Sequence, residues 1–194
     1  VPNIPILFAN AVLPLPNAYG VLSDEEDGIY HAVKRLAQAG RRSIAFVNDD
    51  ETESEEHKLN GYRRAIQECG LPERCYRAER SIEGGQFATT RILRQDSRTD
   101  AIVFTEDTTA VGGLHTLLIT GKRIPEDVAV IGCNNSVYCT ICYPQLSSID
   151  NSLHETGRTA AKQMIRLLNH EPDVEKTICL PCRLVLRDTT PPML

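Results

Sequence analysis

Four short groups of polar residues stand where apolar, β-branched segments of the chain end. They are Asn48-Asp49-Asp50, Glu79-Arg80, Glu106-Asp107 and Cys133-Asn134-Asn135. Carboxylate, amide and guanidinium groups can bind a small polar molecule, and in an open parallel sheet such groups meet at the carboxyl edge of the strands. Strand-helix loops are commonly polar, however, and Asp107 could equally be the N-cap of the next helix. The pattern indicates a candidate binding site and leaves the structural alternative open.

Two other groups of residues have the chemistry of metal ligands. The acidic run from Asp49 to Glu56 offers oxygen atoms to a hard cation, but it lacks the glycine turn and ligand spacing of a calcium loop. The pairs Cys139/Cys142 and Cys179/Cys182 have the spacing of half-sites for zinc, but no glycine forms the tight turn usual between such ligands. We expect no metal and no cofactor, and we interpret the seven cysteines as reduced, small apolar side chains.

Signatures of catalysis are missing from the sequence. It contains no Gly-x-Gly-x-x-Gly, no phosphate loop, no Gly-x-Ser-x-Gly and no His-Glu-x-x-His. The five histidines fall mostly on predicted helices, and His57, beside the acidic run, is best interpreted as a solvated helix residue. The sequence therefore predicts a binding protein and not an enzyme.

The composition is that of a globular protein with its own core. The 194 residues carry a formal net charge of −5, with 41% hydrophobic and 24% charged residues. No apolar run approaches the roughly 20 residues of a membrane span, and no signal peptide is visible. The sequence also has no block of Lys and Arg that would bind nucleic acid. Because the chain opens at Val1 without an initiator Met, we interpret it as part of a longer gene product.

Apolar segments alternate with amphipathic segments along the chain. The predicted strands are 4–8, 43–47, 75–78, 101–105, 128–132, 176–180 and 183–186, and the predicted helices begin near 23, 55, 83, 108 and 153. Glycines at 40, 70 and 121 are placed to end three of the helices. Two Ser-x-x-Glu sequences, Ser23–Glu26 and Ser152–Glu155, predict capping boxes. Repeated strand-helix units predict an α/β fold, a three-layer parallel sheet with helices on both faces.

Several motifs follow one another in a characteristic order. The longest, Gly121–Asn135, reads GKRIPEDVAVIGCNN. Before it stand AGRRSIAFV at 39–47, KLNGYRRAI at 58–66 and DAIVF at 100–104, and after it stand YPQLSSI at 143–149 and LPCRLVLRDTT at 180–190. Together these motifs resemble the effector-binding region of LacI/GalR-type bacterial transcription regulators.

The resemblance implies a periplasmic-binding-protein-like fold of type I with two lobes. Residues 24–150 would form a nearly complete C-terminal lobe, to which 182–194 adds the last strand and a tail. Residues 1–23 and 151–181 would belong to a partial N-terminal lobe. The helix-turn-helix and the rest of that lobe would precede Val1.

The resemblance also implies a function and a site. A small-molecule effector, such as a sugar or a sugar derivative, would bind in the interlobe cleft of a cytoplasmic, homodimeric regulator that binds operator DNA outside this chain. Lys58 stands where the family usually has Arg, and Asn134 where it usually has Asp, so we expect either an atypical effector or weak, degenerate effector control. A solute-binding protein of a sugar transport system is the alternative. The residues assigned to effector binding are Asn10, Ser54, Lys58, Arg80, Glu106, Asp107 and Asn134.

Overall fold

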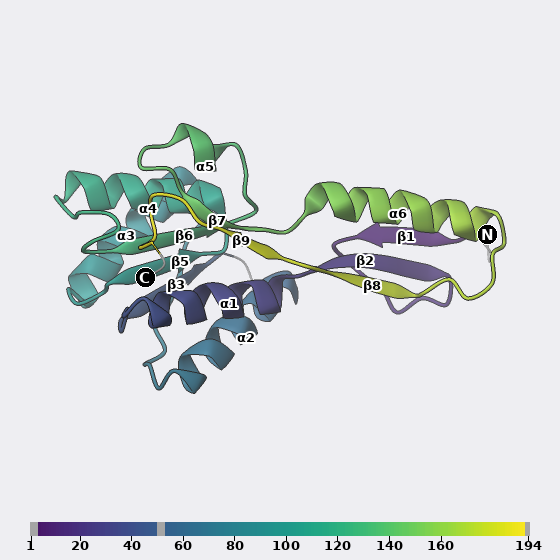
Figure 1. Cartoon of the computed structure of the whole chain (residues 1–194), viewed down its shortest axis with the longest axis horizontal. Coiled ribbons are helices and arrows are strands. Elements are labelled where there is room, and N and C mark those ends of the chain that lie inside the picture. The colour runs from purple at the N-terminus through teal and green to yellow at the C-terminus, as the bar shows by residue number, and fades with distance from the viewer. Residues whose placement is uncertain (1–3, 50–52, 193–194) are drawn as a thin grey trace. The chain divides into compact units, whose positions relative to one another are not determined.

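The computed structural model describes residues 4–49 and 53–192, and the chain divides into two compact units (Figure 1). Unit 1 comprises residues 1–24 and 151–182. Unit 2 comprises residues 25–150 and 183–194. The chain therefore passes from one unit to the other after Asp24, Asp150 and Cys182.

Unit 2 is built on a six-stranded sheet in the order β4-β3-β5-β6-β7-β9. The first five strands are parallel, and β9 pairs antiparallel with β7. Every residue of β5 and β6 is buried, as expected for central strands of a parallel sheet covered on both faces. The strands are β3 (Ile44–Asn48), β4 (Cys75–Arg77), β5 (Ala101–Phe104), β6 (Ala129–Cys133), β7 (Ser147–Asp150) and β9 (Arg183–Val185).

Helices cover both faces of this sheet, which confirms the predicted three-layer α/β arrangement. The helices α1 (Glu25–Gln38) and α2 (Glu53–Glu68) pack together on one face, and α3 (Ile82–Gln95) and α4 (Asp107–Ile119) on the other (Figure 1). A short helix, α5 (Tyr138–Ile141), follows β6. The α3–α4 contact is close enough that a methyl group at Gly85 would overlap the Thr109 carbonyl oxygen.

Helix α2 is anchored on the sheet by an aromatic contact. The rings of Tyr62 and Phe46 stack with centroids 4.8 Å apart. The Tyr62 hydroxyl donates a hydrogen bond to the Ile44 carbonyl oxygen at 3.0 Å and accepts one from the Arg74 backbone N–H at 2.8 Å. Because Lys58 lies one helical turn before Tyr62, this contact determines where Lys58 meets the sheet edge.

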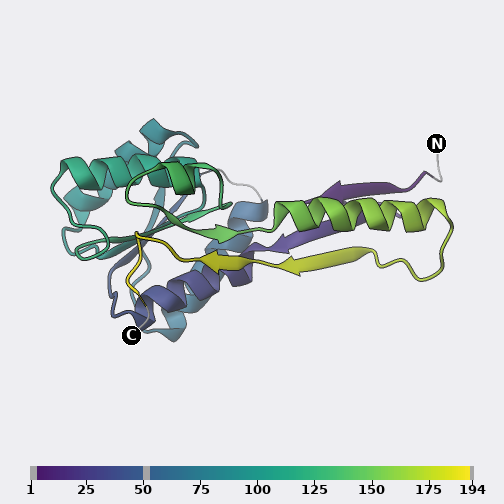
Figure 2. The same ribbon diagram turned by 45° about the horizontal axis from the view of Figure 1, so that its top comes forward.

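Unit 1 is a three-stranded parallel sheet with one helix against it (Figure 2). Its strands are β1 (Ile6–Ala9), β2 (Ala18–Asp24) and β8 (Thr177–Pro181), in the order β1-β2-β8, and α6 (Leu153–Leu168) packs on β1 and β2. Within the described part of unit 1, the buried apolar side chains are those of Ala18 and Val21.

Both predicted capping boxes are wrong. Ser23 lies in strand β2, and its hydroxyl donates to the Asn151 carbonyl oxygen at 2.7 Å instead of capping α1. Ser152 does precede α6, but its φ of 54° puts it in the left-handed region and its side chain makes no capping hydrogen bond. An N-cap side chain needs an extended backbone to reach the first free N–H groups of its helix.

The predicted strands and helices recur in the structure with ends shifted by a few residues, while β2, β7 and α5 were not predicted. Gly40, Gly70 and Gly121 follow helix ends with φ of 88°, 63° and 77°, which confirms their predicted role. In the described ranges, no helix is both long enough and apolar enough to cross a membrane.

Candidate functional site

The carboxyl ends of β3, β5 and β6 bring polar side chains to one edge of the unit 2 sheet. Because the three strands are parallel neighbours, Asp49, Glu106 and Asn134 meet there after largely buried segments. The first turns of α1 and α2 bring further polar residues to the same edge. We call the resulting set the carboxyl-edge network: Glu25, Asp49, Ser54, Glu55, Lys58, Arg80, Thr105, Glu106 and Asn134.

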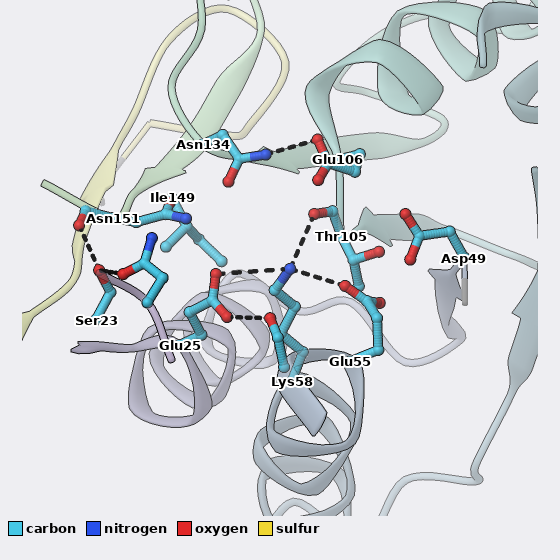
Figure 3. A network of polar contacts seen from close by, with 12 residues as sticks. Ser23, Glu25, Asp49, Glu55, Lys58, Thr105, Glu106, Asn134, Ile149 and Asn151 are labelled. Carbon is cyan, nitrogen blue, oxygen red and sulfur yellow. Dashed lines mark hydrogen bonds and ion pairs between the residues drawn. The ribbon is translucent and has the colours of Figure 1, made fainter. Parts of the chain in front are cut away.

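Lys58 is the centre of one half of the network (Figure 3). Its side chain is only 4% exposed, and its Nζ lies 2.8 Å from Glu55 Oε1 and 3.6 Å from Glu25 Oε1. The ammonium also donates to the Thr105 carbonyl oxygen at 3.5 Å. The Ser54 hydroxyl donates to the other oxygen of Glu25. Lys58 thus links the first residue of α1 to the start of α2 and the end of β5.

Burial and charge act in opposite directions on the Lys58 pair. Burial alone would lower the pKa of Lys58, but Cys133, Glu25 and Glu55 outweigh it and raise that pKa. Burial raises the pKa of Glu55, and the Lys58 charge only partly offsets this effect. The ammonium is therefore firmly protonated, whereas the negative charge on Glu55 is costly.

Arg80 joins the other half of the network. Its guanidinium forms an ion pair with Asp49 and approaches Glu106, with Nη1 3.5 Å from Oε1. The other oxygen of Glu106 accepts a hydrogen bond from Asn134 Nδ2 at 2.6 Å (Figure 3). Burial raises the pKa of Glu106 against the opposing charges of Arg80 and Lys58. The side chain of Arg80 is 51% exposed, unlike Asp49, which is 2% exposed.

The loop after β6 holds Asn134 through its backbone. Asn134 and Asn135 have φ of 98° and 48°, a region that asparagine adopts more readily than most residues. The Asn134 N–H donates to the Ile149 carbonyl oxygen at 2.8 Å, and the Asn135 carboxamide oxygen accepts from Arg187 Nη2 at 2.7 Å. These contacts orient the Asn134 amide toward Glu106.

Asp107 is buried and engaged inside unit 2. Its carboxylate accepts hydrogen bonds from the Ser136 N–H at 2.6 Å and from the Ser148 hydroxyl at 2.7 Å. It also contributes, after burial, to raising the pKa of the Cys139 thiol to about 12. Asp107 begins α4, whereas the N-cap position belongs to Glu106, which makes no side-chain capping hydrogen bond. Asp107 therefore fastens the β6–α5 loop to the sheet.

Asn10 lies in unit 1 and the other six predicted effector-binding residues lie in unit 2. Asn10 has φ of 57°, and its carboxamide oxygen accepts a hydrogen bond from the Ser23 hydroxyl at 3.3 Å. In unit 2, the structure joins Ser54 and Lys58 through Glu25, and Arg80 and Asn134 through Glu106. Asp107 takes no part in either group.

Sequence reasoning missed Glu25 and the pairing of Glu55 with Lys58. Glu25 was interpreted as part of a capping box and Glu55 as part of an acidic run. The spacing from Glu55 to Lys58, three residues apart in a predicted helix, was a usable signal because such residues share a helix face. Nothing local in the sequence indicated that Glu25 lies against Lys58.

The two metal hypotheses find no support among the described residues. Residues 50–52 of the acidic run lie outside the described residues. Elsewhere in the described ranges, no group of three or more His, Cys, Asp or Glu has an arrangement that could hold a metal ion. Cys139 is buried and Cys179 is exposed. Burial raises the pKa of the Cys139, Cys142 and Cys179 thiols.

Comparison with known protein families matches residues 33–190 to the periplasmic binding protein-like domain. An HTH-type transcriptional regulator of Lachnoclostridium phytofermentans is 30% identical over 191 residues, which cover 97% of this chain and 57% of that protein. Catabolite control protein A of Priestia megaterium is 29% identical over 192 residues, which cover 96% of this chain and 58% of that protein. The chain thus spans a little over half the length of these relatives.

Solved structures of LacI family regulators share the fold. One from Arthrobacter sp. FB24 superposes with a TM-score of 0.87 at 28% identity, over 97% of this chain and 71% of that one. One from Enterococcus faecium, with bound ribose, has a TM-score of 0.87 at 25% identity, over 98% of this chain and 72% of that one. These similarities confirm the predicted resemblance and the periplasmic-binding-protein-like fold.

Proposed function

Because this chain belongs to the family of periplasmic binding protein-like domains, we propose that it is the effector-sensing region of a DNA-binding transcriptional regulator. The observation that carries the proposal is the carboxyl-edge network, which gathers hydrogen-bonding groups of several kinds where this type of sheet binds ligands. The similarity of the chain to transcriptional regulators supports regulation over solute transport. The same similarity supports a binding function over catalysis, because these relatives are transcriptional regulators.

The effector in this proposal is a small hydroxylated molecule such as a sugar. Hydroxyl groups both donate and accept hydrogen bonds. Glu106 can accept from them, and Lys58 and Asn134 can donate to them, while Ser54 can do either. Arg80 belongs to the proposed site through its ion pairs with Asp49 and Glu106. Asn10 of unit 1 completes the proposed set of contacts, and Asp107 supports it from inside unit 2. The ribose bound to the Enterococcus faecium regulator is consistent with this class of ligand.

Regulation would follow from differential binding. An effector that binds one conformation of the two units more tightly than another shifts the population toward the first. That shift alters the DNA affinity of a helix-turn-helix elsewhere in the same protein. A protein acting on DNA in this way works in the cytoplasm. We propose lobe boundaries at 23/24, 150/151 and 181/182, each within one residue of a point where the chain passes between the two units, and we propose that the switch acts there.

A homodimer is the second part of the proposal. Large apolar side chains are exposed on α3, α4 and the segment that includes α5: Phe87, Leu118, Ile119, Ile141 and Tyr143. Phe87 and Tyr143 are 80% and 88% exposed. A hydrogen bond of 2.8 Å between Gln86 and His115 joins α3 to α4. Exposed apolar side chains are commonly found at protein interfaces, and we propose that a symmetric pair of chains buries these.

The test of the dimer is the molar mass in solution. Phe87→Glu together with Tyr143→Glu is expected to halve the mass seen by light scattering, because two charges would be desolvated at the interface. Leu168→Glu is the control, since it adds a charge to an exposed position of unit 1. An unchanged mass for the double variant, or a monomeric starting protein, contradicts the proposal.

The test of the function uses the full-length protein. Selection from a randomised DNA pool is expected to recover a palindromic sequence, and a sugar panel is expected to contain a member that changes its binding by about tenfold or more. Lys58→Ala is expected to remove the sugar response and to keep DNA binding. A protein that binds sugars but selects no DNA would instead support a solute-binding protein of a transport system.

A further inference from the structure

The charges of the carboxyl-edge network do not balance. Its described residues include four carboxylates, Glu25, Asp49, Glu55 and Glu106, but two cations, Lys58 and Arg80. Asp49, Glu55 and Lys58 are nearly inaccessible to water, and Glu25 and Glu106 are largely covered. Solvent therefore screens the surplus of negative charge poorly.

The surplus is unfavourable in the structure as it stands. Burial raises the pKa of both Glu55 and Glu106 despite the cations beside them. A raised carboxyl pKa means that the negative form is stabilised less here than it would be in water. A cation brought by a ligand would relieve this cost, whereas an anion would increase it.

Arg80 differs from the other charged groups of the network. It comes from the segment between β4 and α3, and half of its side chain is in contact with solvent. Its guanidinium bridges Asp49 and Glu106. Lys58, by contrast, is enclosed by Glu25, Glu55 and the Thr105 carbonyl oxygen. Arg80 is therefore the cation of the two that water can solvate if a ligand cation takes its place on the carboxylates.

We propose that the effector of this network carries a protonated amino group, and that this group replaces the Arg80 guanidinium on Asp49 and Glu106. An amino sugar, or another hydroxylated amine, has this chemistry: the ammonium donates three hydrogen bonds and the hydroxyls engage the remaining polar groups. The inference rests on the proposed function, because it names the class of effector that the same site binds.

The experiment compares ligands that differ only in charge. Calorimetry on the full-length protein at pH 6.5 would use glucose, glucosamine, N-acetylglucosamine and glucuronate. Galactose and mannose would each be measured with their own amine, N-acetylated amine and uronate in the same way. The amine of at least one set is expected to bind at least tenfold more tightly than its neutral parent and its acetylated form. This preference should largely persist at 0.5 M salt, since salt screens the interactions of buried charges only weakly.

Failure of the inference is distinguishable from failure of the proposed function. If a neutral sugar or a uronate binds as tightly as the matching amine, the inference is wrong and the proposed function stands. If no member of the panel binds, the assignment of a sugar-type effector fails and the inference fails with it.

Two variants test whether the amine of the ligand replaces the Arg80 guanidinium on Asp49 and Glu106. Arg80→Gln is expected to tighten amine binding at least fivefold, because the ligand no longer competes with the guanidinium. Asp49→Asn is expected to weaken it about tenfold. Arg94→Gln is the matched control, since it removes an exposed positive charge at the opposite end of α3. Weaker amine binding by Arg80→Gln would show that Arg80 contacts the ligand, and would overturn the proposed exchange.

Discussion

The two units of the chain are both α/β, yet they bury very different surfaces. In unit 2, β5 and β6 are buried along their whole length. In unit 1, exposed and partly buried residues alternate along β8, and the buried residues of α6 are Thr156 and Gln163. Apolar residues of unit 1 such as Ile165 and Leu168 are exposed.

This contrast explains where the chemistry lies. A desolvated ion pair such as Lys58–Glu55 persists only where a packed core excludes water and fixes both side chains. Unit 2 supplies such a core and unit 1, in the residues described, does not. The comparison predicts that equivalent substitutions have large effects in unit 2 and small effects in unit 1.

The largest difference is expected for lysine. Lys58→Met should lower the free energy of unfolding by about 3–5 kcal/mol, because it leaves Glu55 and Glu25 buried without their cation. Lys176→Met in unit 1 should cost about 1 kcal/mol or less, although Lys176 donates to the Pro16 carbonyl oxygen and lies over the Tyr19 ring. Urea denaturation measures both.

The lysine prediction also depends on pH. The folded-state pKa of Glu55 is raised, so Glu55 favours the folded state at low pH and loses this contribution as pH rises through its pKa. Removing Lys58 raises that pKa further, and the cost of Lys58→Met should be larger at pH 7 than at pH 5. An equal cost at the two pH values would contradict a buried carboxylate charge.

A matched pair of leucines tests the core directly. Leu117 on α4 is fully buried, whereas Leu168 at the end of α6 is 62% exposed. Leu117→Ala should destabilise unit 2 by about 2–5 kcal/mol, because it leaves a cavity. Leu168→Ala should change stability by about 0.5 kcal/mol or less. A large effect of Leu168→Ala would show that α6 packs against something in solution, and would break the comparison.

Two helix glycines should respond with opposite signs. A methyl group at Gly112 on α4 would overlap the Ile82 carbonyl oxygen, whereas nothing lies near Gly157 on α6. Gly112→Ala is expected to destabilise the protein by about 1–3 kcal/mol through overpacking of α3 and α4. Gly157→Ala should stabilise α6 by about 0.5–1 kcal/mol through helix propensity. The midpoint of thermal unfolding reports both signs.

The smallest effect is expected for an ion pair on the surface of unit 2, between Arg123 and Asp127. Hydrogen bonds from Arg123 lower the pKa of Asp127 to about 2 from 3.8. Arg123→Gln should raise it toward 3.8, as measured by NMR titration of the carboxyl carbon. Because the folded-state pKa is lowered, any stability it provides is present above pH 4 and is lost as pH falls toward 2. A pKa near 3.8 for Asp127 in the native protein would contradict the hydrogen-bonded pair with Arg123.

The sequence predicted the strands and helices better than it predicted the contacts between side chains. Strands β3, β5 and β6 were predictable because continuous apolar, β-branched runs are typical of strands buried on both faces. Strand β2 was not, because its last residues, Ser23 and Asp24, also fit the local pattern of a helix cap. Local patterns cannot choose between a strand end and a cap when the deciding partner, here the Asn151 carbonyl oxygen, is 128 residues away.

The sequence alone determined the α/β class, the helix ends at three glycines and the family, since each depends on local periodicity or on motif order. Tertiary structure decided which polar groups face one another. It turned Asp107 inward to Ser136 and Ser148, and it brought Glu25 to Lys58. The physical reason is that hydrogen bonds and ion pairs act over a few ångströms, so their partners are set by how the strands and helices pack and not by neighbours in sequence.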